Sequence, residues 1–257
     1  MFESFSKKGI IMFKIVLLIA MFTFHTINAK ILTEDYSVEY GIIGEIAKVH
    51  ATMKINKNNY VIDAKLKVIG SIANKVTDNL KERHISKGHI FKGRYMTDMY
   101  QMIKSYGKIN STTIYITNHK KKTVSRQYRE WKNGKLIVDQ KVKLKYYASQ
   151  DLFNIFLNLP QYKKQKRGKK YERKVVGADR KNGSVLLSIP TKKEAKKMKN
   201  LLGKKKKGEW YAKLIMQRQI YDSKKGELAL KIGRDGMLET AVLKDLIFFG
   251  DIRILRQ

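Results

Sequence analysis

The chain has 257 residues, no cysteine and a formal net charge of +33 at pH 7. The missing cysteine excludes a disulfide framework, a thiol nucleophile and a lipid attached to cysteine. The excess of lysine and arginine predicts a surface that attracts anions, unless these side chains are simply solvated.

Residues 1–29 have the three parts of a secretory signal peptide. Lys14 precedes an apolar run of ten residues, Ile15 to Phe24, and the small residue Ala29 precedes the expected cut. A helix that spans a membrane needs about 18 to 20 apolar residues, so this run is too short. We therefore expect a periplasmic or otherwise exported protein, cleaved near Ala29, with no transmembrane helix in its mature chain. Met12 is a possible true start of the chain. The alternative to a cleaved signal peptide is an uncleaved anchor or a buried helix.

Residues 30–257 are expected to form a single β-rich domain. Apolar side chains alternate with polar ones along its first part, with the period of two that half-buried strands have. The apolar positions are Tyr36, Val38, Tyr40 and Ile42, then Val49, Ala51, Met53 and Ile55, then Tyr60, Ile62, Ala64, Leu66 and Val68. Turn formers at Gly41–Gly44 and Asn56–Asn59 separate these runs, which predicts antiparallel hairpins. Residues 71–80 fit either a helix or a loop.

The alternating pattern continues through the middle and the end of the chain. Tight turns are predicted at Asn133-Gly134, Asn182-Gly183 and Lys225-Gly226, because asparagine and glycine adopt positive φ angles readily. Between residues 136 and 144 an apolar face alternates with a mostly charged face. This segment is therefore expected to be another half-buried strand.

Two segments have helical spacing instead. Over residues 149–159 an amphipathic helix is expected, with Ser149 as its N-cap and Pro160 as its stop. Its apolar face consists of Leu152, Phe153, Phe156 and Leu157. A second helix is expected from Thr191 to Leu202, because Thr191 and Glu194 form a capping-box pattern and Gly203 fits a C-cap.

The sequence carries no short motif that brings a catalytic mechanism with it: a phosphate loop, a nucleophile elbow, a zincin helix and a dinucleotide fingerprint are all missing. His84 and His89 are five positions apart, which places them on opposite faces of a strand and gives them no shared metal geometry. Carboxylates such as Asp98 and Asp151 are far apart in sequence, so only the fold can bring them together. We expect no catalytic activity, no metal ion and no cofactor.

Two basic tracts are the strongest local signal. Their cationic residues are Lys163, Lys164, Lys166, Arg167, Lys169 and Lys170 in the first tract, and Lys204, Lys205, Lys206 and Lys207 in the second. Aromatic residues stand beside both tracts, Trp210 among them, and rings next to cations suit a membrane interface or a glycan. The tracts predict an anion-binding site for anionic lipid, lipopolysaccharide or acidic glycan, and no nucleic acid is expected in an exported protein. The alternative is a pair of solvated loops without a partner.

Three stretches of the chain resemble exported bacterial proteins grouped as domain of unknown function 3108. These stretches are Tyr36 to Ala47, Ser149 to Leu157, and Gly236 to Ile252. The resemblance implies export and a curved-sheet or barrel-like fold. It implies no activity and no site residue.

These observations favour two functions for a mainly β protein with a curved antiparallel sheet and two or three short helices. In the first, the sheet encloses an apolar groove for a lipid or another amphipathic envelope component. The helix over residues 149–159 then covers the groove as a lid, through Leu152, Phe153, Phe156 and Leu157. In the alternative, the interior is filled by its own side chains, and the protein binds an anionic glycan or envelope surface through its basic tracts. An enzyme is a third possibility, and it requires buried carboxylates or histidines in a cleft.

Overall fold

The computed structural model describes residues 30–178, 182–216, 226–246 and 250–257. The predicted signal peptide and Lys225 of one predicted turn lie outside the described residues. Within these ranges, fifteen strands form one large sheet. Its first part comprises β1 (Lys30–Tyr40), β2 (Gly44–Asn56), β3 (Asn59–Val68), β4 (Lys81–Phe91), β5 (Arg94–Tyr106), β6 (Ile109–Asn118), β7 (Thr123–Lys132) and β8 (Lys135–Lys143). Its second part comprises β9 (Gln150–Asp151), β10 (Lys170–Val176), β11 (Ser184–Ser188), β12 (Trp210–Met216), β13 (Glu227–Ile232), β14 (Leu238–Leu246) and β15 (Gly250–Arg256).

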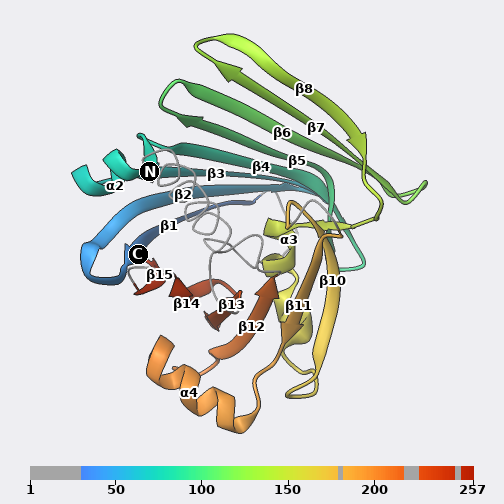
Figure 1. Cartoon of the computed structure of the whole chain (residues 1–257). Coiled ribbons are helices and arrows are strands. Elements are labelled where there is room, and N and C mark those ends of the chain that lie inside the picture. Colours follow the sequence, from blue (N-terminus) through green and yellow to red (C-terminus); the bar gives the residue numbers. More distant parts are fainter. Residues whose placement is uncertain (1–29, 179–181, 217–225, 247–249) are drawn as a thin grey trace.

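The sheet runs from β8 through β1 and β15 to β9. Strands that follow each other in the chain are neighbours in the sheet, except β8 and β9, which form its two ends. Within the described residues every pair is antiparallel except the short pair of β9 with β10. Because β1 pairs with β15, with Tyr36 opposite Arg256, the two ends of the described chain meet in the middle of the sheet. The sheet curls around its inner face without closing (Figure 1). The prediction of a mainly β fold with a curved antiparallel sheet is confirmed.

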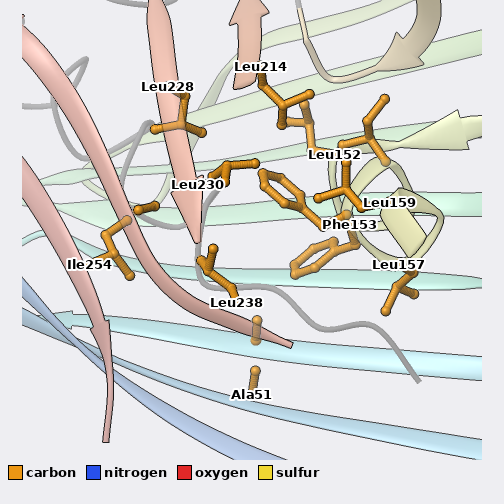
Figure 2. Packing of buried hydrophobic residues seen from close by; sticks show 14 of the residues in the cluster. Ala51, Leu152, Phe153, Leu157, Leu159, Leu214, Leu228, Leu230, Leu238 and Ile254 are labelled. Atoms are coloured by element: carbon orange, nitrogen blue, oxygen red, sulfur yellow. The ribbon is translucent and has the colours of Figure 1, made fainter. Parts of the chain in front are cut away.

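The inner face of the curled sheet carries the hydrophobic core. The predicted alternation is confirmed there, because Tyr36, Val49 and Ile62 are each at most 1% exposed. Across the core, leucine side chains of β12 and β13 face a short helix and the inner side of β1–β3 (Figure 2). Burial of apolar surface stabilises a fold by about 25 cal/mol per Å². Packing of this kind must hold the domain together, since no disulfide is possible.

The first predicted helix is shorter than expected and begins later. Helix α3 spans Leu152–Leu157, and its N-cap is Asp151, whose carboxylate accepts hydrogen bonds from the N–H groups of Phe153 and Asn154. Ser149 is not the cap, because β9 keeps Gln150–Asp151 extended beside β10. Pro160 is not the residue that ends helical structure either, because a 3₁₀ helix follows α3 and contains it. It lies in the first turn of the 3₁₀ helix η2 (Leu159–Tyr162), where its missing N–H leaves no hydrogen bond unmade.

The second predicted helix is confirmed as α4 (Lys192–Leu202). Its capping box is complete, since Thr191 Oγ1 accepts from the N–H of Glu194 and the Glu194 carboxylate accepts from the N–H of Thr191. Helix α4 covers a small second core on the outer face of the sheet, where Ala229 and Val242 point away from the main core. The ambiguous segment after β3 forms helix α2 (Ser71–Thr77). No helix in the described ranges is long and apolar enough to cross a membrane.

Strand β8 differs from the half-buried strand predicted for residues 136–144. Leu136 and Ile137 point to opposite faces, yet they are 52% and 51% exposed. The physical reason is position, because β8 forms one end of the sheet and pairs only with β7. The turn before it is as predicted, with positive φ angles at Asn133 and Gly134.

Candidate functional site

The two basic tracts meet at one pocket, although they are far apart in the sequence. Lys163, Lys164 and Arg167 come from the loop after η2, and Lys205 comes from the loop after α4. The apolar part of the lining comes from Ile189 and Pro190 after β11, and from Trp210 and Tyr211 at the start of β12. The pocket has a volume of about 260 Å³.

Backbone and ring contacts hold the cationic loops in place. The Lys163 ammonium donates a hydrogen bond to the carbonyl of Gly208, at 3.0 Å, which ties the first tract to the loop of the second. At the other end of the first tract the N–H of Gly168 donates to the carbonyl of Ile189, at 2.8 Å. The Lys205 ammonium lies 5.2 Å from the centre of the Tyr211 ring. A cation above a ring in this way is attracted by about 0.5 to 1 kcal/mol at exposed sites.

The electrostatics of the pocket are one-sided. Four of its lining residues are cationic, and the lining contains no aspartate or glutamate. Like charges that converge without a counter-charge produce a positive potential that concentrates anions from solution. The arrangement therefore offers an anion several donors at once.

The other residues of the tracts do not line this pocket. They are Lys166, Lys169, Lys170, Lys204, Lys206 and Lys207. Lys169 lies over the ring of Tyr171 instead, and Lys170 is the first residue of β10, opposite Ser188. The structure thus divides the predicted anion-binding set into four residues at the pocket and six outside its lining.

A second pocket, of about 310 Å³, lies between α4 and the outer face of β12–β14. Charges of both signs line it. Lys213 pairs there with Glu194 at 2.7 Å and with Glu227 at 3.2 Å. Because these charges compensate each other, this pocket is less suited to an anion than the first.

The predicted lid residues are part of the main core. Leu152, Phe153, Phe156 and Leu157 are each at most 3% exposed, and they pack in the same cluster as Leu214, Leu228 and Leu230 (Figure 2). None of the four lines either pocket.

A buried polar network holds α3 against the sheet. The Asp151 carboxylate accepts a hydrogen bond from Ser86 on β4, and the Asn154 amide donates to Thr97 on β5 and to Tyr60 on β3. Burial raises the pKa of Asp151, while its hydrogen bond from Ser86 acts in the opposite direction. These groups are at most 1% exposed, so the network fixes the helix and offers no surface to a ligand.

A second buried cluster joins β4 to β5. The Glu82 carboxylate pairs with the Lys104 ammonium and, at 3.0 Å, with the His84 ring, whose other nitrogen is 2.7 Å from the Tyr100 hydroxyl. Burial acts to raise the pKa of Glu82, but the ion pair with Lys104 brings it below its usual value. Burial lowers the pKa of His84. A buried pair of this kind is costly to break, because removing one partner strands the other charge.

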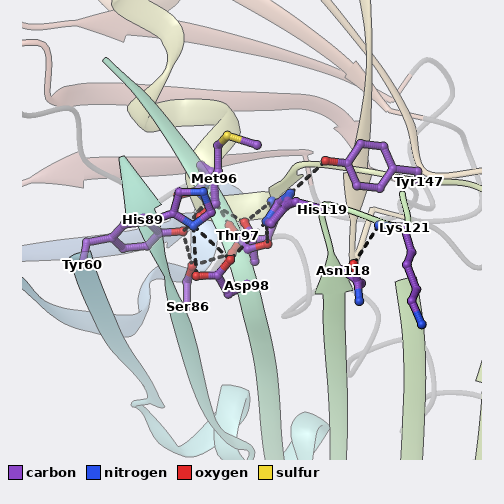
Figure 3. A network of polar contacts seen from close by, with 12 residues as sticks. Tyr60, Ser86, His89, Met96, Thr97, Asp98, Asn118, His119, Lys121 and Tyr147 are labelled. Carbon is purple, nitrogen blue, oxygen red and sulfur yellow. Dashed lines mark hydrogen bonds and ion pairs between the residues drawn. The ribbon is translucent and has the colours of Figure 1, made fainter. Parts of the chain in front are cut away.

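Sequence reasoning missed a third cluster, which lies near the solvent. His89 at the end of β4, Asp98 in β5 and His119 after β6 point toward one another (Figure 3). His89 Nδ1 is 3.0 Å from Asp98 Oδ1, and His119 Nε2 is 3.1 Å from the same oxygen. His84 lies on the same strand as His89, whereas the neighbours of His89 in the cluster come from β5 and from the residue after β6. No local spacing could have identified them.

The comparisons with known proteins show neither a family nor an activity for this chain. No family model matches the chain, and no curated protein matches its sequence. Among solved structures it is similar to a beta-barrel-like protein of the domain of unknown function DUF1849 from Brucella abortus. The identity is 8%, the TM-score is 0.47, and the match covers 90% of this chain and 97% of that chain. The resemblance to domain of unknown function 3108 was wrong, because it rests on loose strand patterns and no family model matches the chain.

Proposed function

We propose that this protein is an exported, non-catalytic binding protein that takes an anionic group of an envelope component in the pocket between its basic tracts. The observation that carries the proposal is the convergence of Lys163, Lys164, Arg167 and Lys205 on one pocket without a carboxylate in its lining. Of the two functions that the sequence favours, this arrangement supports binding through the basic tracts.

The size of the pocket limits what it can hold. Pockets for drug-sized ligands span about 300 to 1,000 Å³, so a pocket of about 260 Å³ suits a phosphate or a similar head group better than a whole lipid. Arginine can hold two oxygens of a phosphate at once, while lysines act as point charges. Trp210 and Tyr211 supply apolar surface beside the cations, as ligands with a polar head and an apolar or ring-shaped body require. Anionic lipid, lipopolysaccharide and acidic glycan all combine an anionic group with an apolar or ring-shaped body.

The test is binding to vesicles of phosphatidylglycerol and phosphatidylcholine, compared with vesicles of phosphatidylcholine alone. Each lysine or arginine near an anionic surface contributes about 1 kcal/mol. Replacing Lys163, Lys164, Arg167 and Lys205 together with glutamine should therefore weaken binding by up to about 4 kcal/mol, close to three orders of magnitude. Binding of the wild type should also fall steeply as salt rises, since the Debye length shrinks to about 3 Å at 1 M.

A control variant separates the pocket from the net charge. Lys48, Lys54, Lys65 and Lys67 are exposed on β2 and β3, and replacing them with glutamine removes the same charge. This variant should retain most of the binding. If both variants lose binding equally, the attraction is a property of the whole surface and the proposal is wrong. Weaker binding only in the pocket variant supports it.

A further inference from the structure

A group of metal-binding side chains lies apart from the basic pocket. The ligand atoms of His89, Asp98 and His119 all lie within 4.8 Å of one another. The rings of His89 and His119 meet edge to face, with centres 5.2 Å apart, and the Asp98 carboxylate lies against both (Figure 3). Their side chains are 34%, 49% and 20% exposed, so an ion can reach them from solvent.

A break in the sheet places Asp98 between the two histidines. In the ladder of β4 and β5, Lys87 lies opposite Met99 and Gly88 lies opposite Thr97, which leaves Asp98 without a partner. This extra residue is a β-bulge, a feature that redirects a side chain and is common beside functional sites. Gly88 is required at the bulge, since a Cβ there would lie 1.9 Å from the carbonyl oxygen of Met96.

We propose that His89, Asp98 and His119 bind a divalent transition-metal ion such as Zn²⁺. Two imidazole nitrogens and one carboxylate form a donor set that zinc sites use, with metal–ligand bonds of about 2.0 to 2.2 Å. Asp98 Oδ1 lies 3.0 Å from His89 Nδ1 and 3.1 Å from His119 Nε2, close to the spacing that neighbouring ligands of a small ion adopt. All three donor atoms lie within 4.8 Å of one another. The three side chains leave at least one position of a four-coordinate ion to water.

A further contact orients one of the ligands. The Nδ1 atom of His119 is 2.8 Å from the hydroxyl of Tyr147. When Nε2 binds a metal, Nδ1 carries the proton and donates a hydrogen bond to this hydroxyl, which holds the plane of the ring. Without a metal, Nε2 can donate to the carbonyl of Thr97, which is 2.9 Å away.

The competing explanation is a pair of ordinary histidine–carboxylate hydrogen bonds. The chain contains such a pair elsewhere, because His50 Nδ1 lies 2.8 Å from Asp35, and both exposed side chains come from the neighbouring strands β1 and β2. That pair lacks a second histidine, so it makes a matched control. A metal site requires all three donors together, whereas hydrogen-bonded pairs behave independently of one another.

The experiment is a titration of the untagged full chain with Zn²⁺ by calorimetry, together with thermal melts. The wild type should bind one ion per chain and melt at a higher temperature with Zn²⁺, because a ligand of the folded state stabilises it. His89→Ala, His119→Ala and Asp98→Asn should each abolish that shift in melting temperature. Tyr147→Phe should weaken binding about tenfold, in the range found when a hydrogen-bond partner of a ligand is lost. His50→Ala should bind as the wild type does.

Two results would overturn the proposal. One is a wild-type protein that binds no Zn²⁺ at millimolar concentration. The other is a set of folded ligand variants that bind with unchanged affinity. If one alanine variant fails to fold, the milder Asp98→Asn and Tyr147→Phe still decide the question, since each keeps the shape of the original side chain.

Discussion

Replacing Phe156 with alanine tests whether α3 is part of a packed core or a lid over a groove. Phe156 is 1% exposed and is one of the largest fully buried side chains among the described residues. It lies on a helix whose six residues are all buried and whose N-terminus is held by the Asp151 network. Its surroundings therefore have little freedom to move into the space that the ring leaves.

The expected loss in the free energy of unfolding is large because the surrounding core cannot move into the cavity. A Phe→Ala change in a core loses the transfer free energy of the ring and leaves a cavity, and it lowers the free energy of unfolding by about 3 to 5 kcal/mol. In a domain of this size each kcal/mol changes the melting temperature by about 2 to 4 °C. We therefore expect the variant to melt roughly 6 to 20 °C below the wild type.

The assay is urea unfolding and a thermal melt, with uptake of a fluorescent fatty acid measured in parallel. Phe91→Ala is the matched control, since Phe91 ends β4 and is 56% exposed. Its free energy of unfolding should change by no more than about 0.5 kcal/mol. If Phe156→Ala is nearly as stable as the wild type and takes up less fatty acid, the helix covers a ligand and the packed-core interpretation is refuted.

Two further predictions concern pH and the N-terminus. The hydrogen bond from Lys213 lowers the pKa of Glu194 from 4.5 to about 2. The depressed value means that Glu194 stabilises the fold above the unfolded pKa and that this contribution disappears as the pH falls toward 2. The stability of Glu194→Gln should therefore fall less steeply between pH 5 and pH 2 than that of the wild type, as urea unfolding at several pH values can show. Export predicts a mature N-terminus at or near Lys30, and sequencing intact residues 12–29 from a cytoplasmic fraction would contradict it.

The features that sequence predicted well are those with a local repeat. Tyr36, Val49 and Ile62 follow a period of two, and their burial needs only a sheet with one covered face. The capping box of α4 depends on two residues three positions apart. Signals of this short range depend little on what each element packs against, so they identify these strands and the second helix correctly.

Predictions failed where the position of an element in the sheet decided the outcome. Leu136 alternates as a half-buried residue should, but it lies on the end strand β8 and is 52% exposed. Ser149 is a good N-cap by composition, yet pairing of β9 with β10 moves the start of α3 to Asp151. In both places the position of the element in the sheet overrides a local preference.

The two proposed sites differ from the rest of the protein in how they arise. Lys163 and Lys205 line one pocket only because β11, α4 and β12 bring their loops together. Asp98 faces His89 and His119 only because an extra residue interrupts the β4–β5 ladder. Loops and bulges are the parts of a sheet protein whose side chains are free of the alternation that packing imposes. In this protein the regular strands therefore determine stability, and the interruptions are where binding chemistry can be placed.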